Sequence, residues 1–121
     1  MNRDTTICIS GLGYVGLPTA ALLARSGFDV LGIDINERTV AELNRGRTIY
    51  QEQCLIELVG DAVGSGRLRA SHVPASADIF IICVPTPVTD GGRADLSAVR
   101  AATETIAPHV KPGNLVILES T

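Results

Sequence analysis

The residues whose types and spacing best suit ligand binding form a glycine-rich segment near the amino terminus. Gly11, Gly13 and Gly16 have the spacing Gly-x-Gly-x-x-Gly. In such a loop the first glycine permits a tight turn, the second lets the backbone approach a pyrophosphate, and the third allows close helix packing. The backbone amides around Tyr14 and Val15, at the start of the next helix, would then face the phosphates. The spacing alone is weak in a chain with 12 glycines, so its context must support it.

An acidic residue closes the next apolar segment, as a dinucleotide-binding site requires. Asp34 is placed to accept hydrogen bonds from the adenosine ribose hydroxyls, and its charge would repel a 2′-phosphate. We therefore expect NAD to be preferred over NADP. The alternative role of capping a helix suits Asn36 better. Arg38 is a counter-signal, because an arginine here can accommodate a 2′-phosphate, but we favour its interpretation as a solvated residue on the helix surface.

A threonine between two prolines is the next candidate. Pro85 and Pro87 lack amide donors and stiffen the loop, so the hydroxyl of Thr86 would be presented rigidly to a ligand. A plain turn residue is an equally good interpretation of Thr86 on local grounds. His72 and His109 lie near loop ends without an acidic or cysteine partner at a useful spacing, so we expect both at the surface.

The three cysteines predict no metal site and no disulfide. Cys8, Cys54 and Cys83 are odd in number, and their spacing fits no zinc or Cys-x-x-Cys pattern. Cys8 and Cys83 lie inside apolar runs, where a cysteine behaves as a small buried hydrophobic residue. We expect all three to be reduced thiols.

Strands and helices alternate around these residues. Short β-branched or continuously apolar runs predict strands, and Ala/Leu-rich or periodic segments ending at glycine predict helices. Asn36 and Asp95 are the expected helix caps. The predicted strands are residues 5–10, 28–33, 68–71, 78–84 and 115–118, and the predicted helices are residues 17–25, 36–44, 53–63 and 95–107.

This alternation predicts an α/β fold of the Rossmann type. Right-handed crossovers give a doubly wound parallel sheet with strand order 3-2-1-4-5 and helices on both faces. The continuously apolar run 78–84 should be buried on both faces of the sheet. Ligands of such sheets bind at the carboxyl ends of the strands, where the strand order reverses. Residues 11–16 and 84–87 should therefore lie side by side in one crevice.

Composition limits the partners and the location. The 121 residues suit one domain spanning 1–121, and a hydrophobic content of 45% suffices for a core. The net charge is -3 and no basic run occurs, which argues against nucleic acid. No apolar run reaches the length of a membrane span, and the first residues do not resemble a signal peptide. We expect a cytoplasmic protein that does not enter a membrane.

Four motifs follow one another along the chain, at residues 9–18, 32–36, 84–87 and 118–121. Together and in this order they resemble the UDP-glucose/GDP-mannose dehydrogenase family, and the resemblance covers essentially the whole chain. It implies NAD as the cofactor and a two-step oxidation of the 6-hydroxyl of a UDP-sugar to a carboxylate, feeding surface polysaccharide synthesis. The implied sugar is UDP-N-acetylmannosamine first, and UDP-N-acetylglucosamine or UDP-glucose after it. The full-length enzyme is expected to be a homodimer.

The resemblance also implies roles for individual residues. Pro85 and Thr86 would lie near the cofactor, and Thr121 would help to position the catalytic water. Glu52 falls where the family often has Glu-Pro at the mouth of the active site. Gln53 replaces that proline here, so the role of Glu52 stays open.

The chain departs from the family in length. Members continue into a sugar-binding domain whose catalytic cysteine lies in a Gly-Gly-x-Cys setting, and this motif does not occur here. We therefore expect a fragment that binds NAD and oxidises no sugar, because none of its own cysteines suits the nucleophile's role. Two alternatives stay open, namely another NAD-dependent dehydrogenase of similar design and a non-catalytic nucleotide-binding module.

Overall fold

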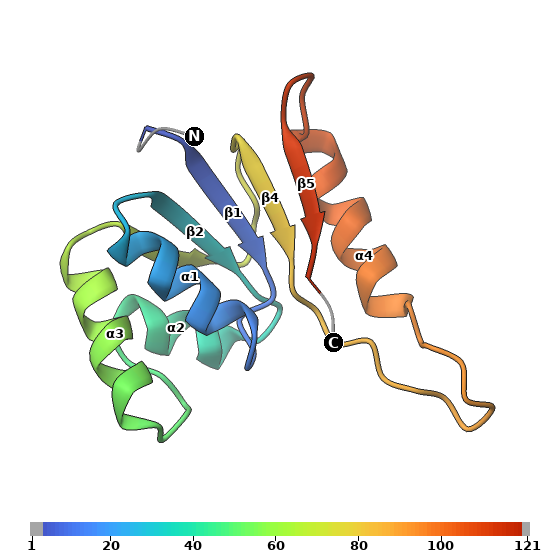
Figure 1. The fold of residues 1–121 in the computed structure, drawn as a ribbon, viewed down its shortest axis with the longest axis horizontal. Coiled ribbons are helices and arrows are strands. Elements are labelled where there is room, and N and C mark those ends of the chain that lie inside the picture. The colour runs from blue at the N-terminus through green and yellow to red at the C-terminus, as the bar shows by residue number, and fades with distance from the viewer. Residues whose placement is uncertain (1–3, 120–121) are drawn as a thin grey trace.

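A parallel sheet of five strands organises the chain (Figure 1). The structure, a computed structural model, describes residues 4–119. The strand order is β3-β2-β1-β4-β5, and every neighbouring pair runs parallel. The predicted fold class and strand order are thus confirmed, and the strand ends differ from prediction by at most two residues. The strands are β1 (Thr6–Ser10), β2 (Asp29–Ile33), β3 (Leu68–Ser71), β4 (Ile79–Ile82) and β5 (Leu115–Leu118).

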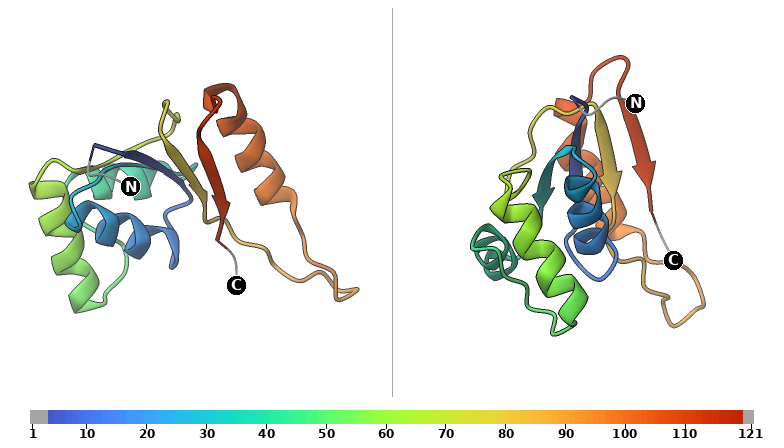
Figure 2. Two further views of the ribbon diagram at one scale, coloured as in Figure 1. Left: turned by 45° about the horizontal axis from the view of Figure 1, so that its top comes forward. Right: turned by 60° about the vertical axis from the view of Figure 1, so that its left-hand side comes forward.

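Helices cover both faces of this sheet, as expected (Figures 1 and 2). Three of them pack on one face and α4 packs on the other. This division follows from right-handed crossovers that leave β1 in opposite directions along the sheet. The helices are α1 (Gly16–Arg25), α2 (Glu37–Asn44), α3 (Gln53–Gly64) and α4 (Ser97–Ile106), and a short 3-10 turn, η1 (Ala107–His109), follows α4.

Strand side chains alternate between two hydrophobic cores. Ile7 and Ile9 of β1 pack toward α1, whose small buried residues Ala20 and Ala21 let the helix approach the sheet closely. Cys8 lies on the opposite face, in a smaller core with Phe80 and the α4 side chains. All four residues of β4 are buried, as the continuous apolar run predicts. In contrast, all four residues of the edge strand β5 are exposed.

The helix starts show one accurate prediction and one error. Asn36 caps α2, because its side-chain oxygen accepts hydrogen bonds from the amides of Arg38 and Thr39 at 3.0 and 3.2 Å. The prediction that Asp95 caps the fourth helix is wrong, since α4 begins at Ser97 and Leu96 is its N-cap residue. Asp95 lies one position earlier and accepts hydrogen bonds from the Ser97 amide and hydroxyl at 2.9 and 2.6 Å. A carboxylate before the cap thus still satisfies a free amide of the first turn.

Candidate functional site

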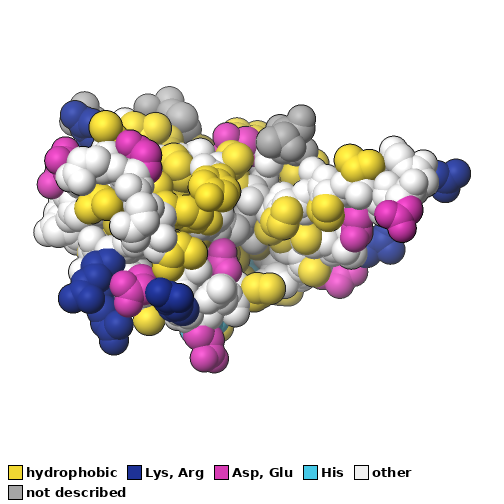
Figure 3. Space-filling model, turned by 90° about the horizontal axis from the view of Figure 1, so that it is seen from below, with side chains coloured by type: hydrophobic (Ala, Val, Ile, Leu, Met, Phe, Trp, Pro, Cys, Tyr) yellow, Lys and Arg dark blue, Asp and Glu magenta, His cyan; other side chains and the backbone are white. Residues whose placement is uncertain are grey.

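A crevice of about 460 Å³ opens at the carboxyl ends of β1, β2 and β4. It lies where the strand order reverses, between β1 and β4, which is the expected ligand position in an open α/β sheet. Gly11, Gly13, Asp34 and Pro85 line it on the sheet side, and alanines of α4 line the other side. Figure 3 views the molecule from this end and shows apolar side chains gathered centrally, with charged groups mainly at the periphery.

Two of the three motif glycines are required by the fold itself. Gly11 has a φ of +103°, and a Cβ there would lie 2.7 Å from the carbonyl oxygen of Cys83. A Cβ on Gly16 would overlap the carbonyl oxygen of Gly11. The Gly11 amide also donates a hydrogen bond to the carbonyl of Ile33 at 2.8 Å. Together these contacts hold the loop tightly against the ends of β2 and β4.

Gly13 differs from its two neighbours in the motif. A Cβ there would have 3.8 Å of clearance from the hydroxyl of Tyr50, and its φ lies outside the left-handed region. Among residues 4–119, no contact therefore demands glycine at this position. The missing side chain leaves open space over the loop, which fits the role of the second glycine in admitting a pyrophosphate.

Asp34 fastens the glycine loop to the end of β2. One carboxylate oxygen accepts a hydrogen bond from the amide of Leu12, and the other accepts one from the amide of Asn36, both at 2.9 Å. The carboxylate is half-buried and lines the crevice. Each oxygen keeps acceptor capacity for a further donor. Asp34 can therefore position the loop and still accept ribose hydroxyls.

The remaining predicted site residues vary in their relation to the crevice. Pro85 lines it, and Thr86 lies half-buried in the same loop. Arg38 is exposed in the first turn of α2 and is not among the described residues that line the crevice. Val15 is the N-cap residue of α1. Thr121, the predicted catalytic residue, lies outside the described residues.

An aromatic pair stands beside the glycine loop. The side chain of Tyr14 is 81% exposed, and its ring lies against that of Tyr50 with centroids 4.5 Å apart and the planes tilted by 42°. Burial, followed by the neighbouring Tyr14 and Asp34, raises the pKa of Tyr50. Sequence reasoning missed Tyr50, because no local motif marks it as a neighbour of the loop.

Three further residues, His72, Glu52 and His109, have no assigned role from the sequence. His72 is exposed, as predicted, but it also lines the crevice, and its Nδ1 lies 3.3 Å from the carbonyl oxygen of Asp34. Glu52 is the N-cap of α3, where its carboxylate accepts the amides of Cys54 and Leu55 at 3.0 and 2.8 Å. His109, also predicted to lie at the surface, is half-buried in η1.

The thiols are free and do not form a nucleophilic site. Cys8 and Cys83 are buried, as predicted, and Cys54 is exposed. Cys83 donates a hydrogen bond to the carboxylate of Glu119 at 3.4 Å. Burial and then Glu119 raise the pKa of Cys83 from 9.0 to about 12, so this thiol stays protonated. Burial also raises the pKa of Cys8.

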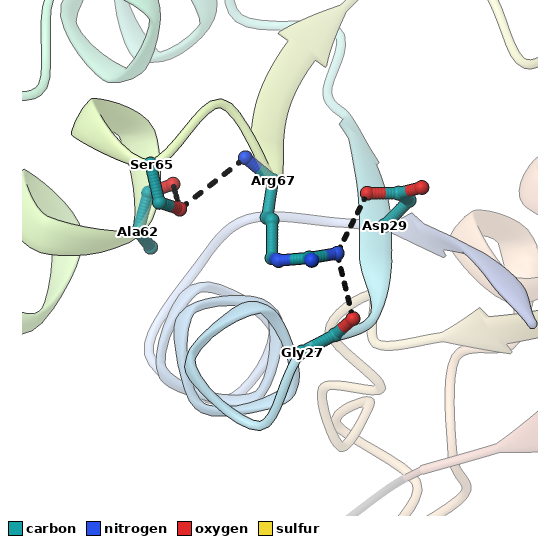
Figure 4. A network of polar contacts seen from close by, with 5 residues as sticks. All are labelled: Gly27, Asp29, Ala62, Ser65 and Arg67. Carbon is teal, nitrogen blue, oxygen red and sulfur yellow. Dashed lines mark hydrogen bonds and ion pairs between the residues drawn. The ribbon is translucent and has the colours of Figure 1, made fainter. Parts of the chain in front are cut away.

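A second hollow of about 330 Å³ lies at the amino ends of β1, β2 and β3. Arg67 crosses it and donates hydrogen bonds to the carbonyl of Gly27 at 2.7 Å and to the carboxylate of Asp29 at 3.3 Å (Figure 4). The Arg67 amide donates to the Ser65 hydroxyl at 3.4 Å. The polar groups here therefore connect α1, α3 and the strands to one another.

Membrane-spanning helices and metal-binding groups are absent from residues 4–119. Within this range no helix combines the length and apolarity needed to cross a membrane. The same residues contain no group of three or more His, Cys, Asp or Glu side chains arranged to hold a metal ion.

Comparison with known proteins gives a consistent result. Residues 5–121 match the family described as "UDP-glucose/GDP-mannose dehydrogenase family, NAD binding domain". The chain is 49% identical over 118 residues to the UDP-N-acetyl-D-mannosamine dehydrogenase of Methanocaldococcus jannaschii, which covers 95% of this chain and 28% of that protein. It is 50% identical over 116 residues to the NDP-N-acetyl-D-galactosaminuronic acid dehydrogenase of Ralstonia nicotianae, covering 96% and 27% respectively.

A solved structure supports the same relationship. The UDP-N-acetyl-mannosamine dehydrogenase Cap5O of Staphylococcus aureus superposes with a TM-score of 0.93 at 42% identity. The match covers 97% of this chain and 29% of that one. The chain thus spans less than a third of the length of these relatives.

Proposed function

The chain belongs to the UDP-glucose/GDP-mannose dehydrogenase family as an NAD-binding domain, and we propose that it serves the oxidation of a UDP-sugar 6-hydroxyl to a carboxylate in two NAD-dependent steps. The observation that carries this proposal is the open space over Gly13. It lies in a crevice that also contains Asp34 and Pro85. When NAD is bound, its nicotinamide supplies the hydride acceptor.

The chain's own residues bind and orient the cofactor. The glycine loop leaves room for the pyrophosphate beside the amides of Tyr14 and Val15 at the start of α1. Asp34 accepts the adenosine ribose hydroxyls and disfavours a 2′-phosphate. Pro85 lines the crevice from the β4 side, Thr86 in the same loop lies near the cofactor, and Thr121 helps to position the catalytic water. Arg38 contacts the adenosine end of the cofactor from the first turn of α2.

The sugar is proposed from the relatives. One relative is named for UDP-N-acetyl-D-mannosamine and another for an NDP-N-acetyl-D-galactosaminuronic acid. Both names specify an N-acetylated sugar. We therefore place UDP-N-acetylmannosamine first, followed by UDP-N-acetylglucosamine and UDP-glucose. The product would be a nucleotide-linked uronic acid for the synthesis of surface polysaccharide, and the enzyme would act in the cytoplasm as a homodimer.

Cofactor preference tests the proposal directly. Calorimetry of the 121-residue chain should show NAD binding more tightly than NADP by roughly tenfold or more. Asp34→Ala should weaken NAD and remove the preference, because the ribose acceptor and the repelling charge are both lost. Asp29→Ala is a matched control, since Asp29 lies at the amino end of β2. A preference of the wild-type chain for NADP, or an affinity for NAD that Asp34→Ala leaves unchanged, would contradict the proposal.

A second test asks whether this chain binds the cofactor without catalysing the oxidation. Incubation of the 121-residue chain with NAD and UDP-N-acetylmannosamine should produce no NADH above background. Hydride transfer needs a positioned sugar, and the second oxidation step needs a thiolate. Cys83 stays protonated and Cys8 is buried, so these two cannot supply it. Turnover by this chain would mean that it contains catalytic groups other than those described.

A further inference from the structure

Both tyrosines of this chain lie at the glycine loop. The sequence contains two tyrosines and no tryptophan. Tyr14 belongs to the loop, and Tyr50 reaches it from the segment between α2 and α3. The two rings are in contact, with centroids 4.5 Å apart. The spectroscopic signal of tyrosine in this protein therefore reports on one place.

Tyr50 is held in position by the fold, whereas Tyr14 is largely exposed. The ring of Tyr50 is half-buried against the larger hydrophobic core. Its amide donates a hydrogen bond to the hydroxyl of Thr48 at 3.1 Å, which fixes the local turn. Its own hydroxyl has no hydrogen-bond partner within residues 4–119. A fixed ring therefore presents an available hydroxyl group.

That hydroxyl points to the space over Gly13. It lies 3.8 Å from the position that a Cβ on Gly13 would take, and this is the nearest contact such a Cβ would make. The pyrophosphate of a bound dinucleotide passes over the second glycine of the motif. A ligand atom close to Gly13 would thus come within reach of the Tyr50 hydroxyl.

The chemistry of the crevice calls for a donor of this kind. Among the described residues that line it there is no lysine or arginine, and Asp34 contributes a negative charge. A pyrophosphate there depends on backbone amides and on neutral donors. The phenol of Tyr50, whose pKa burial raises above its ordinary value, is protonated at neutral pH and can donate a hydrogen bond to an anionic oxygen.

We propose that Tyr50 is a cofactor-positioning residue whose hydroxyl donates a hydrogen bond to the pyrophosphate of the bound dinucleotide, with its ring supported by Tyr14. This inference rests on the proposed binding of NAD in the crevice. It adds to the glycine motif a side-chain donor that comes from a different segment of the chain. Through Tyr50, the segment that leads into α3 would thereby contact the bound dinucleotide.

Calorimetry on three forms of the chain tests this assignment. Tyr50→Phe keeps the ring and its packing and removes only the hydroxyl. Thr103→Val is a matched control, because it removes an exposed hydroxyl of α4 that bonds to the carbonyl of Val99. Each form is titrated with NAD, ADP and adenosine. Tyr50→Phe should raise the Kd for NAD and for ADP roughly tenfold and leave that for adenosine within about twofold.

The outcomes are distinguishable from failure of the proposed function. If the wild-type chain binds no NAD, the proposed function fails. If the wild-type chain binds NAD and Tyr50→Phe binds it equally well, the role of Tyr50 is wrong. A loss of equal size for NAD and for adenosine would also overturn the role, because the hydroxyl would then act on the nucleoside rather than the pyrophosphate.

Ring-labelled tyrosine provides a readout that a purely structural role would not move. NMR spectra of the chain with isotope-labelled tyrosine rings contain signals from two residues, which Tyr50→Phe assigns. Addition of ADP should shift the Tyr50 signals, whereas adenosine should shift them less. Tyr50 signals that do not respond to ADP at saturation would contradict the proposal.

Discussion

The two ends of the sheet carry hollows of comparable size but opposite character. At the amino ends of the strands, the side chain of Arg67 bonds to Gly27 and Asp29, and Asp78 accepts the amide and the hydroxyl of Thr6. At the carboxyl ends, Gly13 and the Tyr50 hydroxyl leave space and hydrogen-bonding capacity toward the crevice. The side chains of Arg67, Asp29 and Asp78 at the amino end are thus bonded within the fold, whereas the Tyr50 hydroxyl at the carboxyl end is available to a ligand.

Cavity size alone therefore does not identify a binding site. The amino-end hollow includes two arginines and so offers positive charge. Its lining residues include Thr6, Asp29, Gly66, Arg67 and Arg69. Its polar contacts nevertheless join elements of the fold to one another. The crevice combines apolar walls with a few polar groups, which is typical of sites for small molecules and cofactors.

The largest change in the free energy of unfolding is expected when one glycine at each end of the sheet is replaced by alanine. Gly16→Ala should lower the free energy of unfolding by about 3 kcal/mol or more, because its Cβ would overlap the backbone of Gly11. Gly66→Ala, at the amino-end hollow, has a φ of +80° and nothing within 4 Å of the new Cβ. It should cost only about 1 kcal/mol of backbone strain. Urea denaturation measures both, and equal losses would contradict the packing described for the loop.

Gly13→Val should separate binding from stability. The new side chain would take the space proposed for the pyrophosphate, so the Kd for NAD should rise about 100-fold or more. The free energy of unfolding should fall much less than in Gly16→Ala, because the new Cβ would meet only the Tyr50 hydroxyl, 3.8 Å away. Gly64→Val, at the end of α3, has open space around it and is the matched control. Unchanged NAD affinity in Gly13→Val would remove the loop from the site.

Arg67→Gln tests the structural role of the amino end. Loss of the bonds to Gly27 and Asp29 should lower the free energy of unfolding by about 1 kcal/mol at most, because both side chains of the ion pair are well exposed. The affinity for NAD should stay the same within error of calorimetry. A clear loss of NAD binding in this variant would mean that the two ends of the sheet are coupled.

The smallest effect concerns the buried thiols, of which each hollow has one. Cys8 lines the amino-end hollow and Cys83 the crevice, and burial raises the pKa of both. At pH 8 iodoacetamide should alkylate the exposed Cys54 and spare these two, as peptide mass spectrometry would show.

The same thiols give a pH dependence of definite sign. The pKa of Cys83 rises from 9.0 to about 12 on folding, so the unfolded chain ionises first. Its contribution to stability is therefore complete below pH 9 and is lost as the pH rises toward 12. Cys83→Ala should show a shallower decline over this range. Equal declines in both proteins, or alkylation of Cys83 at pH 8, would contradict the burial described here.

Local sequence patterns predicted most of this fold. Continuous apolar runs mark β1 and β4, and Gly27 and Gly46 mark the ends of helices, because strand burial and helix termination depend on neighbouring residues. The glycine spacing and Asp34 predicted the crevice because they too form a motif within a short stretch of sequence. The cap of α4 was misplaced by one residue, because the N-cap position is held by Leu96 and Asp95 precedes it.

Contacts between distant segments could not be predicted in this way. Tyr50 reaches Tyr14 only because the chain between α2 and α3 returns to the glycine loop. His72 reaches the carbonyl of Asp34 because β3 pairs with β2 in parallel register. Neither route is encoded by a periodicity or a motif at these residues, so both depend on the assembled tertiary structure.

Mapping the NAD-binding surface by amide NMR tests the central claim most directly. Titration of the ¹⁵N-labelled chain with NAD should shift the amides of residues 11–16 and 34–36, together with those of Val84, Thr86 and Tyr50. The amides of Asp29, Arg67 and Arg69 at the amino-end hollow should keep their positions. Shifts confined to the amino-end hollow, or none at saturating NAD, would show that the crevice at the carboxyl ends is not the cofactor site.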